Sequence, residues 1–226
     1  MSREKPSQAK VANGVLLDGR LALFHQRQRW LAIADLHFGF ELSQRAVGNL
    51  FPLWGMKTIE MRLKELLRDY RPKHLILLGD LVHDRTAAPV FGRLLRRLRR
   101  SADIILISGN HDRALGTGFQ LVNSWRSKGF CFHHGHCEIS TPGEIQVIGH
   151  HHPAHVVRDG AGLRLKLPVL VQRDNCWIMP AFSPWAAGTV WDGDEHEQMW
   201  LCSPQRVFQI SNDVIGRRST CSTTSQ

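Results

Sequence analysis

Ile104-Ile105-Leu106-Ile107-Ser108-Gly109-Asn110-His111-Asp112 is the stretch that decides the fold of this chain. Its first four residues form a short apolar run, which is typical of a strand buried on both faces of a sheet. Gly109 lets the backbone turn where a side chain would clash, and three polar residues follow at once. Because chemistry collects at the carboxyl ends of strands in open α/β sheets, this turn is the first candidate for a functional site.

Four other polar clusters in the chain also close an apolar run. Two of them follow strand-like segments in the first half, and two are rich in histidine and lie further on. They are Asp35-Leu36-His37, Gly79-Asp80-Leu81-Val82-His83-Asp84, His133-His134-Gly135-His136 and Gly149-His150-His151-His152-Pro153. We expect the five clusters to meet in one site, because each stands at the end of a predicted strand.

The length of 226 residues favours one well-cored α/β domain, which would bury roughly 70% of the unfolded surface. We expect a flexible N-terminus over 1–10, a single domain over 11–212 and a disordered tail over 213–226. A hairpin is predicted around Asp18-Gly19. An amphipathic helix over 56–70 lies between two predicted strands, which should therefore be parallel.

The remaining segments have weaker signals. Residues 38–55 are expected to be a loop with at most a short helix, which either covers the substrate or is a plain connection. The apolar residues between Phe119 and Trp125 indicate a further helix. Beyond Phe130, short strand-like pieces separated by turn residues predict a second, mostly antiparallel sheet.

Composition limits the compartment and the partners. The first ten residues lack an apolar segment and no apolar run is long enough to span a membrane, so a cytoplasmic protein without a membrane contact is expected. Five cysteines without a C-x-x-C pair are expected to be reduced. The net charge of +9 favours an anionic partner such as nucleic acid. Five arginines in a predicted helix either follow a phosphate backbone or form a solvated face: Arg93, Arg96, Arg97, Arg99 and Arg100.

The donor types in the clusters point to metal chemistry. Nitrogen and oxygen donors without a thiolate suit Mn²⁺, Fe or Zn²⁺ better than a cysteine-rich zinc site or an all-oxygen Ca²⁺ site. The candidate ligands are too many for one ion, but a carboxylate can bridge two, and two ions can stabilise the attacking and leaving oxygens at a phosphorus. These ligands are Asp35, His37, Asp80, Asn110, His134, His150 and His152.

The order of these motifs between Trp30 and Pro153 resembles the motif series of the calcineurin-like metallophosphoesterases. The resemblance implies an α/β (α+β) fold, a four-layer αββα sandwich of two facing mixed β-sheets flanked by helices, with two metals. It would place Asp35, His37 and His152 on one metal. Asn110, His134 and His150 would hold the other, and Asp80 would bridge them. His111 would donate a proton to the leaving group.

The residues that follow Gly79-Asp80 differ from the pattern of one branch of this superfamily. The serine/threonine phosphatases have an aspartate three positions after the Gly-Asp aspartate, whereas this chain has His83 there. Histidine at this position resembles the nuclease branch. Either His83 or Asp84 could orient His111. Arg85 and Arg113 could clamp a phosphate, although an ordinary surface role is the alternative for both.

A narrower likeness covers about residues 11–192. Three stretches of the second half are similar to the ligase-associated DNA-damage-response metallophosphoesterases, whereas Ser183-Pro184-Trp185 departs from them. This resemblance implies DNA as substrate, with DNA-ligase or helicase repair partners. The stretches are Leu165-Lys166-Leu167-Pro168, Met179-Pro180-Ala181-Phe182 and Ala186-Ala187-Gly188.

The leading hypothesis is therefore a phosphodiesterase that prefers Mn²⁺ and cuts single-stranded DNA as an endonuclease in DNA repair. One alternative is a phosphatase or nucleotide hydrolase that acts on a small phosphorylated molecule with the same metals. The other is a non-catalytic scaffold of the same fold. Lost ligands would mark a scaffold, and every expected ligand is present in this sequence.

Overall fold

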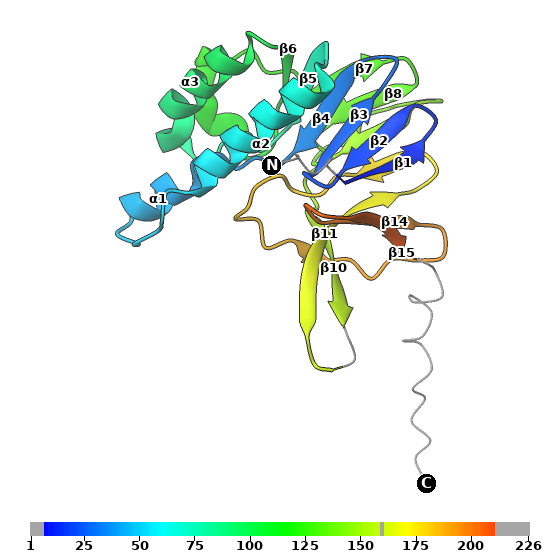
Figure 1. Cartoon of the computed structure of the whole chain (residues 1–226). Helices are drawn as coiled ribbons and strands as arrows, with labels where there is room; N and C mark the ends of the chain where they lie inside the picture. The colour runs from blue at the N-terminus through cyan, green and yellow to red at the C-terminus, as the bar shows by residue number, and fades with distance from the viewer. Residues whose placement is uncertain (1–6, 159–160, 211–226) are drawn as a thin grey trace.

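The computed structural model describes residues 7–158 and 161–210, apart from the side chains of residues 113, 114 and 117. Its first sheet has six strands in the order β1-β2-β3-β4-β5-β6 (Figure 1). The strands are β1 Gln8–Ala12, β2 Val15–Asp18, β3 Ala22–His25, β4 Trp30–Ala34, β5 His74–Leu78 and β6 Asp103–Ile107. The first four pair antiparallel, and β4, β5 and β6 pair parallel.

The register of the parallel strands places their ends at one edge of the sheet. Ala34 pairs with Leu78, and Leu78 pairs with Ile107. Each is the last residue of its strand, and the first three polar clusters follow directly. The continuous apolar runs thus form strands that are largely buried, and their polar continuations emerge side by side.

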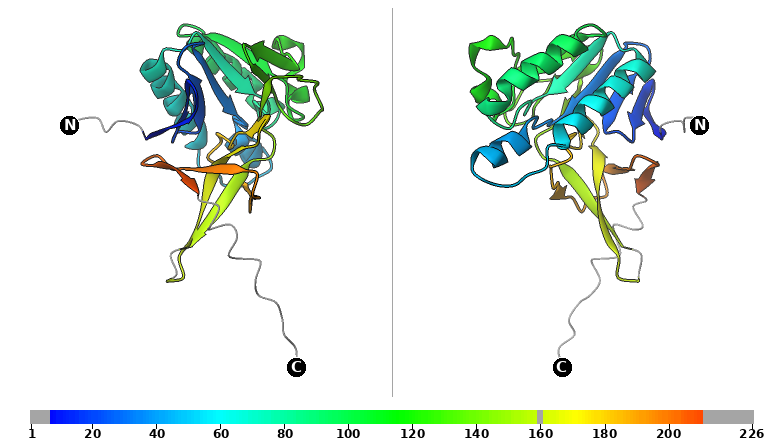
Figure 2. Two further views of the ribbon diagram at one scale, coloured as in Figure 1. Left: turned by 90° about the vertical axis from the view of Figure 1, so that its right-hand side faces the viewer. Right: turned by 60° about the vertical axis from the view of Figure 1, so that its left-hand side comes forward.

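Three α-helices and two 3₁₀ turns lie between the strands of this half. They are α1 Phe40–Ala46, α2 Gly55–Tyr70, α3 Ala88–Leu98, η1 Arg85–Ala87 and η2 Asp112–Gly118. The apolar faces of α2 and α3 are buried in the same core as the first sheet. Figure 2 shows these helices against that sheet. The arginines of α3 are exposed, and Arg97 pairs with Glu60 of α2 at 2.8 Å.

The second sheet is mixed and has the order β13-β10-β11-β12-β9-β8-β7, with β14 and β15 attached through β11. Most of its pairs are antiparallel, but β9 is parallel to both β8 and β12, and β10 to β13. Its strands are β7 Ser124–Ser127, β8 Phe130–His133, β9 Ile145–Ile148, β10 Pro153–Arg158, β11 Arg164–Gln172, β12 Cys176–Ile178, β13 Thr189–Val190, β14 Gln198–Cys202 and β15 Val207–Ile210.

Aromatic side chains join the two sheets. Trp30 of β4 contacts Phe130 and Phe132 of β8 edge to face, with ring centroids 5.2 and 4.9 Å apart. All three are buried, and aromatic pairs in this arrangement contribute about 0.5–1.5 kcal/mol beyond their burial. This packing fixes the sheets face to face and confirms the expected sandwich of two mixed sheets.

Two expectations about local structure were wrong. Strand β1 begins at Gln8, inside the 1–10 segment expected to be flexible, because it pairs with β2. The segment from Phe119 to Trp125 is not a helix. The backbone N–H of Val122 donates to Leu106 of β6, and its carbonyl oxygen accepts from Ser108, which directly follows β6. This pairing with the edge of the sheet, rather than a helix, fixes the position of the segment.

Other expectations agree with the structure or lie outside it. The predicted Asp18-Gly19 turn joins β2 to β3, and the 38–55 segment holds the short α1 and, at its last residue, the start of α2. The four cysteines in the described part are free. No helix within residues 7–158 and 161–210 is long and apolar enough to cross a membrane. The predicted tail over 213–226 lies outside the described residues.

The aromatic contact between the sheets makes a prediction for stability. Phe132→Ala should lower the free energy of unfolding by about 3–5 kcal/mol, because it leaves a cavity between the sheets. Urea denaturation of both variants measures the effect. Phe208→Ala, a partly exposed control on β15, should cost less than about 1 kcal/mol. Equal losses in the two variants would contradict the role of the sheet interface.

Candidate metal centre

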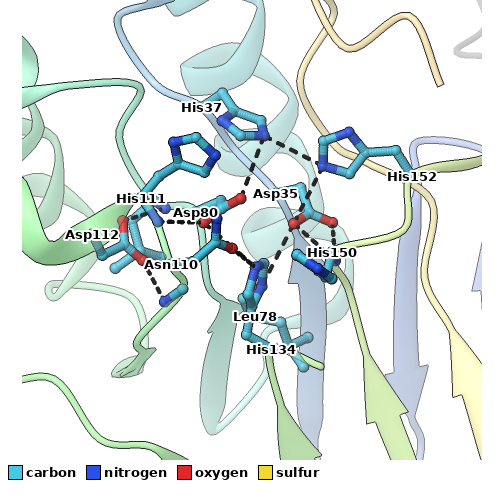
Figure 3. Close-up of polar contacts among 12 residues, drawn as sticks. Asp35, His37, Leu78, Asp80, Asn110, His111, Asp112, His134, His150 and His152 are labelled. Atoms are coloured by element: carbon cyan, nitrogen blue, oxygen red, sulfur yellow. Dashed lines mark hydrogen bonds and ion pairs between the residues drawn. The ribbon is translucent and has the colours of Figure 1, made fainter. Parts of the chain in front are cut away.

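The seven predicted ligands come together where the edges of both sheets meet (Figure 3). Asp35 follows β4, Asp80 follows β5 and Asn110 follows β6, so the first sheet supplies oxygen donors at its carboxyl edge. The second sheet supplies imidazoles from the ends of β8 and β9. The centre therefore forms only when the two sheets are packed together.

One group of donors gathers around His37 and His152. Their Nε2 atoms lie 3.3 Å apart. The Nε2 of His152 lies 3.5 Å from Oδ1 of Asp35, and the Nε2 of His37 lies 3.8 Å from Oδ2 of Asp80. One donor atom of each of these four residues lies within 4.8 Å of the others. Two imidazole nitrogens that face each other in this way suit a shared cation.

A second group gathers around His134. Its Nε2 lies 3.4 Å from Oδ1 of Asp80 and 3.2 Å from Oδ1 of Asn110. Donor atoms of Asp80, His134 and His150 lie within 4.8 Å of one another. Asp80 thus belongs to both groups and presents a different oxygen to each. These two groups contain the residues to which the family resemblance assigned the two metals, and the assignment itself stays a prediction.

The buried carboxylates at the centre favour the binding of a cation. Asp35 and Asp80 are 0% and 2% exposed, and among the described residues their ion-pair partners are all histidines. Burial lowers the pKa of His37 to about 4, which keeps its imidazole neutral and able to bind a metal. Burial also opposes ionisation of Asp80, but the hydrogen bond and charge of His134 hold its pKa well below the usual range. Buried carboxylate oxygens beside imidazole nitrogens therefore fit divalent ions.

Most of these ligands have strained backbones. Eight described residues other than glycine have positive φ, and five of them are candidate ligands, so the backbone strain is concentrated at the metal centre. Such positions are sterically unfavourable for residues with a Cβ and cost on the order of 1–3 kcal/mol each. They are Asp35 at 54°, His37 at 41°, Asp80 at 44°, His150 at 71° and His152 at 48°.

Two glycines make room for the ligands. A Cβ on Gly109 would overlap the backbone nitrogen and Oδ1 of Asp80. A Cβ on Gly79, whose φ is +70°, would overlap the imidazole of His134. Gly109, which was predicted to let the chain turn, and Gly79 thus let ligands from three different strands approach one another.

Asp112 has a structural role that the sequence did not assign to it. Its buried carboxylate accepts hydrogen bonds from the backbone N–H groups of Gly109 at 2.8 Å and Leu81 at 2.7 Å. Burial raises its pKa to about 6, and these backbone hydrogen bonds counteract the rise. The carboxylate ties the turn after β6 to the turn after β5. The only signal in the sequence was that an acidic residue ends the Gly109-Asn110-His111-Asp112 cluster.

The predicted catalytic residues lie beside the ligands. The backbone N–H of His111 donates to Oδ1 of Asp80 at 3.1 Å, and the exposed His111 ring lies 5.7 Å from that of His37. The His83 ring lies 6.1 Å from the His37 ring and 4.8 Å from Phe40. Asp84 has a different partner, since its carboxylate caps η1 by accepting from Thr86.

The two arginines and two further histidines complete the surroundings. Arg85 is exposed in η1, and the side chain of Arg113 lies outside the described part. His136 lies 5.2 Å from His134 between ring centroids, and His151 lies 5.3 Å from His150. Both histidines belong to the clusters quoted from the sequence, but neither was assigned a role.

The crowding at Gly109 can be tested directly. Gly109→Ala should weaken Mn²⁺ binding about 10–100-fold, because displacement of Asp80 disturbs both donor groups. Titration calorimetry measures the affinity. Gly118→Ala, where a Cβ would meet open space, is the matched control and should bind Mn²⁺ as the parent does. Unchanged binding by the Gly109 variant would show that Asp80 tolerates the displacement.

Comparisons with known proteins agree with this geometry. The chain is similar to the crystal structure of the Pseudomonas putida nuclease MPE, with 26% identity and a TM-score of 0.72 over 91% of this chain and 100% of that one. YfcE, a phosphoesterase from E. coli, gives 15% identity and a TM-score of 0.43 over 80% of this chain and 97% of that chain. No curated protein matches the sequence significantly.

The sequence model of the calcineurin-like phosphoesterases matches residues 29–204, which include all seven candidate ligands. The metal-ligand groups and the nuclease neighbour agree with the activity of this family. This chain belongs to the calcineurin-like phosphoesterase family and is a metal-dependent hydrolase of phosphoesters.

Proposed function

We propose that this protein is a Mn²⁺-dependent endonuclease that cuts single-stranded DNA. The observation that carries the proposal is the pair of donor groups joined through Asp80, with His111 beside them. The likeness to a nuclease over 91% of the chain supports a phosphodiester substrate. The net charge of +9 supports a polyanion. Nitrogen and oxygen ligands support Mn²⁺.

The candidate ligands would form two cation sites. Asp35, His37 and His152 would hold one ion, and Asn110, His134 and His150 the other, with Asp80 shared. When bound, such a pair supplies Lewis acidity toward the phosphate and activates water for attack. Leu78 helps to orient the second group, because its carbonyl oxygen lies 3.1 Å from Nδ1 of His134 and fixes the ring with Nε2 toward Asp80.

His111 is placed to move a proton. Its backbone is tied to Asp80, whereas its exposed ring remains free to reach a substrate at the opening of the centre. An imidazolium there can protonate the oxygen that leaves phosphorus when the strand is cut. We assign the orientation of this ring to His83 rather than Asp84, because the Asp84 carboxylate is engaged by Thr86.

The biological setting belongs to the same proposal. A role in DNA repair and DNA-ligase or helicase partners are proposed on the narrower family resemblance alone. A cytoplasmic location is proposed from the composition and the free cysteines.

Nicking of circular single-stranded DNA tests the activity. With added Mn²⁺ the parent protein should convert circles to linear product, and Asp80→Ala should abolish the conversion because it removes a ligand from both groups. Parallel reactions with Mg²⁺ and Zn²⁺ test the metal preference. Intact circles from a protein that still hydrolyses a simple phosphoester would support the small-molecule alternative instead.

The proton donor can be tested through the leaving group. His111→Ala should slow DNA cleavage roughly 10²–10⁴-fold. The loss should be much smaller with a nitrophenyl phosphodiester, because its leaving group needs no proton. Equal losses on both substrates would remove His111 from this role.

The same pair of substrates distinguishes the two candidates that could orient His111. His83→Ala should show a weaker form of the same leaving-group dependence, whereas Asp84→Ala should not. If Asp84→Ala gives the leaving-group effect and His83→Ala does not, the assignment of the orienting residue is reversed.

A further inference from the structure

A groove of about 1270 Å³ opens beside the metal centre. It begins at the candidate ligand His152 and is walled by α2, by the start of β10 with the middle of β11, and by the turn after β14. Sites for small molecules usually enclose roughly 300–1,000 Å³, so this groove is larger than one small substrate requires. Its size suits a longer ligand whose reacting group lies at the metals.

The three stretches that carried the narrower resemblance meet in this groove, although none of them holds a candidate ligand. Lys166, Ala181 and Ala186 are members of the three stretches, and each lines it. The small side chains leave the floor open to close approach by a backbone. Lys166 adds a positive charge, for which the described ion pairs show no carboxylate partner.

Arg62 of α2 is an unusual arginine in the wall. It is half-buried, it donates a hydrogen bond to the carbonyl oxygen of Phe182 at 3.2 Å, and its guanidinium lies 5.2 Å from the centre of the Phe182 ring. No carboxylate of the described residues pairs with it, and burial lowers its pKa. A guanidinium held without an acid in a groove is suited to bind an anion from solution.

The other charges in the groove already have partners. Arg20 pairs with Asp18 and Asp69, each at 2.8 Å. Arg68 also pairs with Asp69, at 3.1 Å. Glu65, the remaining acid, lies 4.0 Å from Arg20. The acids of the wall are therefore balanced by these arginines, and Arg62 and Lys166 remain as cations for a ligand.

The segment that Arg62 contacts is hydrogen-bonded to the metal centre. The backbone N–H of Phe182 donates to Ala34 at 2.8 Å, and that of Ser183 donates to Asp35 at 3.1 Å. Arg62 therefore binds a segment that lies directly over a candidate ligand. Arg62 and the candidate ligand His152 line the same groove, so an anion on Arg62 would share that groove with a phosphate at the metals.

We propose that this groove binds the DNA strand next to the phosphate that is cut, with Arg62 and Lys166 contacting backbone phosphates. The inference rests on the proposed endonuclease function and names where its substrate lies. Contacts of this kind position a strand and give affinity without reading its sequence. The small lining residues leave room in the groove for sugars and bases.

The test compares variants that differ by one charge. Arg62→Gln keeps an amide donor for the Phe182 carbonyl and removes the charge, and Arg62→Lys keeps the charge. Lys166→Gln removes the second cation. Arg27→Gln is the matched control, because Arg27 is an exposed arginine in the turn after β3 and lies outside the groove. Each protein is assayed with Mn²⁺ on a single-stranded oligonucleotide and on a nitrophenyl phosphodiester.

We expect Arg62→Gln to raise KM for the oligonucleotide about tenfold, which matches the loss of one hydrogen bond to a charged group. Arg62→Lys should recover part of the affinity. The slope of log affinity against log salt should fall by about 0.7 for each phosphate contact removed. The KM of the Arg27→Gln control should stay within about twofold, although that variant changes the net charge by the same amount.

Three results would overturn the inference. If Arg27→Gln weakens DNA binding as much as Arg62→Gln does, net charge rather than the groove is responsible. If Arg62→Gln slows both substrates equally and lowers the Mn²⁺ content, Arg62 only supports the metal centre. If the parent hydrolyses the small ester but neither binds nor cuts the oligonucleotide, the endonuclease function itself has failed. That last result is seen without any variant.

Discussion

Two buried carboxylates, whose ion-pair partners among the described residues are all histidines, are the constraint on which the rest of this structure depends. Asp35 and Asp80 lie out of contact with solvent, and the described residues offer them no lysine or arginine. A buried charge without a partner is strongly unfavourable, and neutral histidines compensate it poorly. The pKa of His134 is raised because the hydrogen bond and charge of Asp80, with the charge of Asp35, outweigh its burial. The two carboxylates therefore favour the binding of additional positive charge at the centre, which two divalent ions would supply.

The strained backbone conformations of the fold lie where these ions would bind. Five candidate ligands adopt left-handed backbone conformations, and the surrounding structure has to stabilise them. The rigid support comes from both sides, because the ends of β4, β5 and β6 are in register and Trp30 holds β8 against them. Since each donor group takes ligands from both sheets, packing between the sheets and the geometry of the metal centre are coupled.

The sequence predicted those features that depend on neighbouring residues. Apolar runs that end in polar clusters identified β4, β5 and β6 together with the ligands that follow them, and periodicity identified α2. It failed where a distant strand decided the outcome. The 119–125 segment has apolar residues compatible with a helix, but the backbone of Val122 pairs with β6 instead. Strand β1 likewise extends to Gln8 because β2 offers it a partner.

The same limit explains what was missed around the site. The role of Asp112 depends on backbone N–H groups of Leu81 and Val82, 31 and 30 residues away in the chain, which no local pattern reveals. The groove is assembled from separate segments between β1 and the turn after β14, so neither its size nor the lack of an acid beside Arg62 can be read from spacing. Sequence motifs located the chemistry, whereas the surface beside it depends on tertiary packing.

The segment from Ala181 to Gly188 connects these two parts of the protein. On one side its Phe182 carbonyl accepts from Arg62, and its backbone pairs with the end of β4. On the other side Trp185 donates to the buried Glu41 at 3.0 Å, and its indole ring packs so closely on α2 that a Cβ on Gly55 would overlap it. The departure from the family pattern at 183–185 thus provides an anchor between α1 and α2. Because this segment lines the groove and also donates a backbone hydrogen bond to Asp35, whatever holds it in place would position the proposed DNA strand and this candidate ligand together.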